Sequence, residues 1–290
     1  MEKYLNAVGF KKYVQDQQVK EVIQQVINNP TEKYISNYCE DKIKIELCKK
    51  YDDELGIIIR GELDEKEEIK ILAVIPYKKG NIIMDINEVD VINTDDKDDY
   101  YVYFEDEKTG NPITFYLQNV VDYLDIKDDE KVYIENIKLV ALSIEGTVIL
   151  PVEKEDVDVI LEKEEEKWRA SLLELAREGD EEAIGLLESD AKQAAELFKQ
   201  RCQQEDLLTI LEGYFIPYGL NDAEYSILGT IDDFCIKVNS FTKEEVYILD
   251  VTCLNFKMQV CINKEDLIGI PSKGMRFKAI CHIQGHIEFI

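Results

Sequence analysis

The sequence predicts an α+β fold: a strand-rich antiparallel N-terminal domain, a helical middle segment and a small C-terminal β-barrel. Apolar and polar residues alternate over residues 1–152, and the alternation returns over residues 214–290. Between them, over residues 153–213, apolar residues recur at helical spacing. We therefore expect three domains with these boundaries. The last is the size of a five-stranded OB-like barrel, and a six-stranded sandwich fits nearly as well.

The first domain is expected to begin with a helix over residues 19–27, which Asn28, Asn29 and Pro30 end. Alternation then predicts seven or eight strands, paired antiparallel through short turns. Glu145 and Gly146 are interpreted as one of these turns, and a short helix is expected at 120–124. The expected strands cover residues 43–47, 55–59, 69–75, 100–105, 113–117, 132–144 and 147–150.

The middle segment is expected to form two or three antiparallel helices. Gly179 followed by Asp180 indicates the end of one helix and the N-cap of the next. Trp168 is interpreted as a core anchor of the first of these helices. In the third domain we expect strands at residues 225–231, 235–240, 246–253, 258–262 and 275–290.

The chain is strongly acidic, with 61 Asp and Glu against 34 Lys and Arg, a formal charge of −27. Residues 1–150 carry −13, residues 151–213 carry −11 and residues 214–290 carry −3. Binding to bare nucleic acid requires Lys and Arg to neutralise phosphates, so the first two segments are excluded from that role. The exclusion is weaker for residues 214–290. An anionic membrane surface is disfavoured on the same ground.

The cysteines and the apolar runs indicate a cytoplasmic protein. No signal peptide and no apolar run of about 18 residues is present. The seven cysteines are odd in number and form no C-x-x-C motif, which argues against a disulfide scaffold.

Three stretches together carry a family resemblance: MEKYLNAVGF at 1–10, ITFYLQN at 113–119, and YSILGTI at 225–231 with Gly285. With its length and acidity, the chain resembles a family of uncharacterised cytoplasmic proteins of Gram-positive anaerobic bacteria. The resemblance implies a cytoplasmic bacterial setting, but no activity, substrate or catalytic residue.

The two histidines lie on the last expected strand. His282 and His286 share a face with Gln284 and Glu288, and about 13 Å separates the histidines, so one metal ion cannot bridge them. These four residues are interpreted as a polar binding face or as an exposed strand surface; exposed polar strands are the commoner case. His282 and the adjacent Cys281 point to opposite faces, which argues against a catalytic pair.

Known chemical motifs are missing. The sequence holds no P-loop, dinucleotide-binding or nucleophile-elbow motif. The acidic runs at 95–99 and 125–130 lack the ligand pattern of a calcium loop and are interpreted as solvated turns. The sequence therefore assigns no catalytic, cofactor-binding or metal-binding residue.

Tyrosines at 101, 103 and 116 are predicted to lie on two paired strands. Cross-strand aromatic packing explains Tyr101, Tyr103 and Tyr116 structurally. The alternative is an aromatic surface for a ligand or partner, because tyrosine is enriched at interfaces.

The function favoured by these observations is that of a non-catalytic cytoplasmic protein that binds another protein through acidic surfaces. One alternative is a carboxylate-dependent enzyme with a pocket in the first domain. A second is a nucleic-acid-related role, through the C-terminal barrel or as an acidic decoy. No membrane partner or cofactor is expected, and no small-molecule ligand is assigned.

Overall fold

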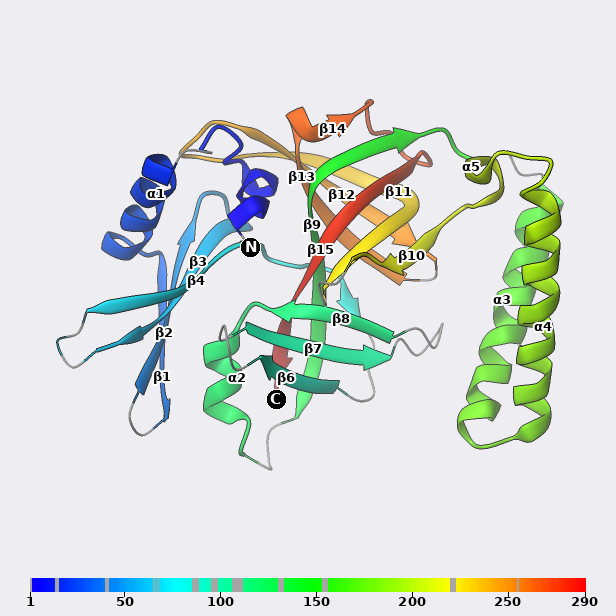
Figure 1. Cartoon of the computed structure of the whole chain (residues 1–290), viewed down its shortest axis with the longest axis horizontal. Coiled ribbons are helices and arrows are strands. Elements are labelled where there is room, and N and C mark those ends of the chain that lie inside the picture. The colour runs from blue at the N-terminus through cyan, green and yellow to red at the C-terminus, as the bar shows by residue number, and fades with distance from the viewer. Residues whose placement is uncertain are drawn as a thin grey trace.

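The chain has a mixed α/β fold that is richer in strand than in helix, in agreement with the predicted α+β class. Figure 1 shows two β-sheets beside each other and a pair of long helices that stands apart from them. The computed structural model describes residues 2–13, 16–39, 42–64, 66, 68–84, 89–94, 99–105, 112–129, 133–152, 156–219, 223–254 and 256–290. For residues 16, 37–39, 42, 156–163, 166 and 256 it describes the backbone alone.

The first sheet is an antiparallel meander in the order β1-β2-β3-β4. Its strands are β1 (Glu32–Cys39), β2 (Lys42–Lys50), β3 (Leu55–Leu63) and β4 (Ile69–Lys78). Helix α1 (Asp16–Asn28) ends where Asn28 and Pro30 predicted, and it packs on one face of this sheet. Ile45 and Leu47 point to that face, so the alternating residues Glu46 and Cys48 point to the other.

The second sheet contains eleven strands among the described residues. They are β5 (Ile83–Met84), β6 (Val89–Thr94), β7 (Asp99–Glu105), β8 (Pro112–Leu117), β9 (Ile134–Ile149), β10 (Tyr214–Pro217), β11 (Glu224–Val238), β12 (Glu245–Cys253), β13 (Phe256–Asn263), β14 (Leu267–Ile268) and β15 (Arg276–Phe289). Backbone pairings run from β11 through β12, β13, β9 and β15 back to β11. Because β9 joins β13 to β15, residues 214–290 alone do not complete this ring, and the predicted C-terminal barrel is not confirmed.

Two expected breaks are absent. Strand β9 continues through Glu145 and Gly146, so the expected turn is wrong. A Cβ at Gly146 would lie 2.6 Å from Cε2 of the Phe277 ring, so the glycine serves close packing instead of a turn. Likewise β11 is one strand, and the interruption expected after Ile231 is a register shift between Ile231 and Asp233.

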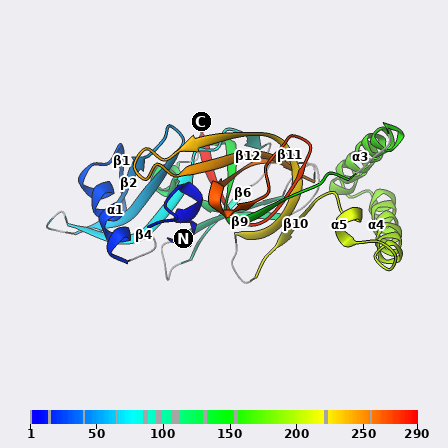
Figure 2. The ribbon, with the colours of Figure 1, turned by 90° about the horizontal axis from the view of Figure 1, so that it is seen from above.

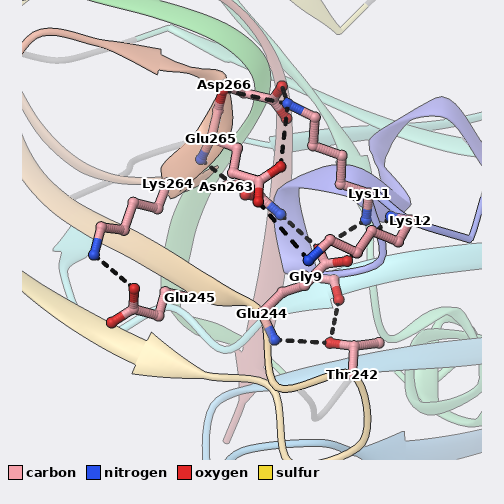
Figure 3. A network of polar contacts seen from close by, with 10 residues as sticks. All are labelled: Gly9, Lys11, Lys12, Thr242, Glu244, Glu245, Asn263, Lys264, Glu265 and Asp266. Atoms are coloured by element: carbon pink, nitrogen blue, oxygen red, sulfur yellow. Dashed lines mark hydrogen bonds and ion pairs between the residues drawn. The ribbon is translucent and has the colours of Figure 1, made fainter.

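The N-terminal segment fills the junction of the two sheets. Within η1 (Glu2–Val8), Tyr4, Leu5 and Val8 are buried against residues of both sheets. The polar network of Figure 3 holds in place the residues that come after η1 in the chain. Glu244 accepts hydrogen bonds from the backbone N–H of Lys11 at 2.9 Å and of Lys12 at 3.0 Å. Thr242 Oγ1 donates to Gly9 O at 2.6 Å. These contacts tie the backbone of residues 9–12 to the turn between β11 and β12, which indicates a structural role for the network.

The middle segment is helical, as predicted. Its helices are α3 (Asp156–Arg177), α4 (Glu181–Arg201) and the short α5 (Leu207–Ile210). Asp180 caps α4 by accepting from the backbone N–H groups of Glu182 and Ala183, and Gly179 has a φ of +89°. Both views show α3 and α4 as a hairpin projecting to one side of the sheets (Figures 1 and 2). No helix in the described residues is long and apolar enough to cross a membrane.

Candidate functional site: a polar cavity between the sheets

A cavity of about 280 Å³ lies where the polar face of the first sheet meets the second. Strands β1 to β4, the turn after β8, helix α2 (Val120–Ile126) and the end of β15 all contribute side chains to it. Strand alternation places Glu46, Cys48 and Lys50 of β2 on this face together. Glu32 and Tyr34 of β1 join them in the same way.

One side of the cavity contains a buried ion pair. Arg60 Nε donates to Glu46 Oε1 at 2.7 Å, and both residues are buried. Glu46 Oε2 also accepts from the backbone N–H of Val121, at 3.3 Å. Burial raises the pKa of Glu46, against the opposing effect of the Arg60 guanidinium. Both oxygens of Glu46 are therefore held by donors.

A thiol and a phenol meet beside this pair. Cys48 Sγ lies 2.8 Å from Tyr77 Oη, and the Tyr77 ring lies close over Gly56, where a Cβ would approach it to 2.6 Å. Burial raises the pKa of Cys48 to about 11, so the group is a neutral thiol at physiological pH. The arrangement does not provide an activated nucleophile.

The remaining acids of the cavity, apart from Asp122, are paired with lysines. Lys50 binds Glu32, and Lys138 binds Glu288. The hydrogen bond from each lysine lowers the pKa of its glutamate. Glu32 also accepts from Tyr34 Oη at 3.2 Å, which fixes the tyrosine at the wall.

Three polar lining groups have little or no engagement within the described parts of the chain. The Lys79 side chain and the His286 imidazole have no ion-pair or hydrogen-bond partner there. The Asp122 carboxylate accepts only a long hydrogen bond, 3.4 Å, from Asn119 Nδ2. Burial lowers the pKa of His286, so the imidazole is neutral at physiological pH.

The four residues of the predicted polar face separate into two pairs. His282 and Gln284 are buried, so the alternative of an exposed strand surface is wrong for them. Gln284 binds Gln118 and Pro76, whereas Nε2 of His282 has no hydrogen-bond partner. His286 and Glu288 line the cavity. A binding role for this face stays a prediction.

The three tyrosines also occupy different environments. Tyr116 is buried, accepts from Arg60 Nη1 at 3.0 Å and donates to Asp99 at 3.0 Å. Tyr101 packs edge-on against Tyr116, as cross-strand pairing predicted. Tyr103 is exposed. They do not form one continuous aromatic surface, because Tyr116 faces the interior.

The cavity gives limited support to carboxylate catalysis. That chemistry needs an acid with a raised pKa beside an ionised carboxylate. Glu46 has the raised pKa, but Arg60 and Val121 occupy its oxygens. No group of three or more His, Cys, Asp and Glu residues suited to a metal ion occurs among the described residues. The acidic run at 95–99 lies outside them except for Asp99, and Asp125, Asp128 and Asp129 of the second run are exposed.

A model of one family covers nearly the whole chain. Residues 5–285 match the domain of unknown function described as "E. rectale Gene description (DUF3881)". The chain belongs to the DUF3881 family. This confirms the resemblance to an uncharacterised family, here named from a Gram-positive anaerobe. No curated protein and no solved structure matches this DUF3881 chain.

The stretches that carried the resemblance are packing segments in this DUF3881 member. Residues 2–10 lie at the sheet junction, and residues 225–231 lie in β11. A Cβ at Gly285 would approach the Phe115 ring to 2.4 Å. The stretch at 113–119 is β8 and the turn after it, which brings Gln118 and Asn119 to the cavity.

Sequence reasoning missed most of the cavity. Glu46, Cys48 and Lys50 alternate with Ile45 and Leu47, a pattern that indicates a strand with one wet face. The only usable signal for a covered face was Cys48, because an unpaired cysteine is more often buried than exposed. Lys79 and Asp122 gave no signal.

Proposed function

We propose that this protein is a non-catalytic interaction protein whose α3–α4 hairpin binds a partner protein with a basic surface. The observation that carries the proposal is the exposure of large apolar side chains on this hairpin. Trp168 and Leu175 are 42% and 43% exposed, and Leu186 and Leu197 are 44% and 60% exposed. Interpreting Trp168 as a core anchor was therefore wrong.

The exposed apolar residues fall on defined helix faces. Trp168 and Leu175 are two turns apart and share a face of α3, and Leu186 and Leu197 are three turns apart on α4. Leu172 of α3 and Ala183 of α4, in contrast, are buried. Exposed apolar residues rimmed by charge mark protein-binding surfaces, and tryptophan is enriched in their energetic centres.

The charge of the hairpin selects the kind of partner. Residues 156–201 contain 14 acidic and 7 basic residues, a net charge of −7. Two copies of the hairpin would repel each other, as would the hairpin and a nucleic acid. A basic protein surface that carries apolar residues complements both the charge and the exposed rows.

Two further features belong to this proposal. We infer that the ring of β11, β12, β13, β9 and β15 is a small barrel. The inference is supported by a shared core to which each strand contributes one residue, in that order Ile227, Val251, Val260, Leu139 and Phe277.

The six cysteines with described side chains are free thiols, which supports a cytoplasmic location.

Capture from cell extract at low and moderate salt tests the proposal. The bait variants are Trp168→Gln with Leu175→Gln, and a control pair, Ile92→Gln with Ile270→Gln, exposed elsewhere. We expect the wild type and the Ile92/Ile270 control variant to capture one basic protein, and to capture less of it at moderate salt. The Trp168/Leu175 variant should not capture it. No partner at either salt, or equal capture by both pairs, would contradict the proposal.

A further inference from the structure

The cavity has the size of a small-molecule site. Its volume, about 280 Å³, is just below the range of typical ligand pockets, which begins at about 300 Å³. It can hold one small metabolite but no peptide segment. Tyr34, Tyr77 and Ile58 supply apolar surface beside the charged groups.

Most polar groups of the lining are committed to one another. Glu46 binds Arg60, Glu32 binds Lys50, and Glu288 binds Lys138. Asn119 donates to Ile287 O at 2.9 Å and accepts from Ile287 N at 3.1 Å. A ligand would have to break these bonds to use the groups, so the uncommitted groups decide what is recognised.

The groups without such partners are one carboxylate, one ammonium group and one neutral imidazole. Asp122 and Lys79 carry opposite charges, and both line the same cavity as His286. Within the described residues Lys79 has no ion-pair partner, and the Asp122 carboxylate has the single long hydrogen bond from Asn119. Charged groups that line a concave site without partners favour a ligand of complementary charge.

We propose that the cavity binds one small zwitterion of the α-amino-acid class, with its ammonium group at Asp122 and its carboxylate at Lys79. His286, which lines the same cavity, adds a hydrogen-bonding group. A simple cation would meet the repulsion of Lys79, and a dianion would meet that of Asp122. The ligand side chain would lie against Ile58 and the tyrosines.

Ligand-detected NMR with individual free L-amino acids at about 10 mM tests this proposal, because that concentration detects a Kd of about 1 mM or tighter. The matching N-acetyl amino-acid amides, which lack both charges, serve as controls. Asp122→Asn and Lys79→Met remove the two proposed contacts. Asp125→Asn and Lys33→Met remove exposed charges on the same helix and on β1.

We expect at least one amino acid to bind with a Kd of about 1 mM or tighter, and its uncharged analogue to bind at least tenfold more weakly. Asp122→Asn and Lys79→Met should each weaken binding at least tenfold, and the two controls less than twofold. Ile58→Phe, which narrows the cavity and keeps its charges, should also abolish binding. Urea midpoints verify that each variant is folded.

Three outcomes would overturn the proposal. They are the failure of every amino acid to bind, binding of the uncharged analogue as strong as that of the amino acid, and equal effects of the cavity and control substitutions. This test is independent of the partner proposed for the hairpin, because none of its residues lies on α3 or α4.

Discussion

Arg60 and Glu46 form a buried ion pair across β2 and β3, with Arg60 Nε 2.7 Å from Glu46 Oε1. The same guanidinium donates from Nη1 to Tyr116 Oη at 3.0 Å and from Nη2 to Leu117 O at 3.2 Å. Tyr116 and Leu117 belong to β8 of the second sheet. Arg60 therefore joins the two sheets, and it does so beside the cavity.

Replacing this arginine should be strongly destabilising. Arg60→Met leaves Glu46 buried without its counter-ion, which costs about 3–5 kcal/mol of the free energy of unfolding. Urea unfolding followed by circular dichroism measures the change. The exposed Lys70→Met, which removes only a surface contact to Glu62, should cost about 1 kcal/mol or less.

The double variant Arg60→Met with Glu46→Gln should recover part of the loss, because it removes the unpaired charge. A single variant as stable as the wild type would show that the guanidinium does not hold the sheets together.

His282 should make the fold sensitive to acid. Burial lowers its pKa from 6.5 to about 3, so the folded chain excludes a proton that the unfolded chain binds below pH 6.5. The contribution of the neutral His282 ring to the free energy of unfolding is fully present above pH 6.5, and it is lost as the pH falls toward 3. Between pH 7.5 and 5 the loss amounts to about 2 kcal/mol.

His282→Phe tests this, because its ring keeps the packing on Tyr4 and Nε2 has no hydrogen-bond partner to lose. Urea unfolding at pH 7.5 and pH 5 should show a smaller acid-side loss in the variant than in the wild type, by about 2 kcal/mol. Equal losses would mean that other groups account for the acid sensitivity.

The sequence predicted local elements better than it predicted their contacts. The alternation of Ile45 and Leu47 identified β2, and Asp180 identified the start of α4, since each depends on residues close in sequence. The burial of Glu46 depends on Arg60 and Val121, which are 14 and 75 positions away. Alternation alone cannot show whether the polar face of a strand is in water or covered.

The sequence could not show, for a related reason, whether Gly146 forms a turn or a closely packed position in a strand. Beside a glutamate, Gly146 has the composition of a turn, yet it lies inside β9. Its packing partner Phe277 comes from β15, far along the chain. The cavity residues were unpredictable in the same way, because they come from strands of both sheets and from α2.

Gly146→Ala should therefore destabilise the fold without altering a turn. Its Cβ would lie 2.6 Å from the Phe277 ring and 2.9 Å from Ile262 Cδ1, which costs about 1–3 kcal/mol. Thermal unfolding measures the loss. In a chain that already carries Phe277→Leu, Gly146→Ala should cost less stability than it costs in the wild type, because the smaller side chain leaves room for the Cβ. Full stability of Gly146→Ala would contradict the close packing described here.

The central claim, that the α3–α4 hairpin is the partner-binding surface, is tested most directly by amide hydrogen exchange. The exchange of the whole protein is compared with and without the basic protein that it captures. We predict slower exchange in the complex over residues 156–201, with little change over β1–β4 and in the five-strand ring. Slower exchange confined to the sheets, with the hairpin unchanged, would contradict the account.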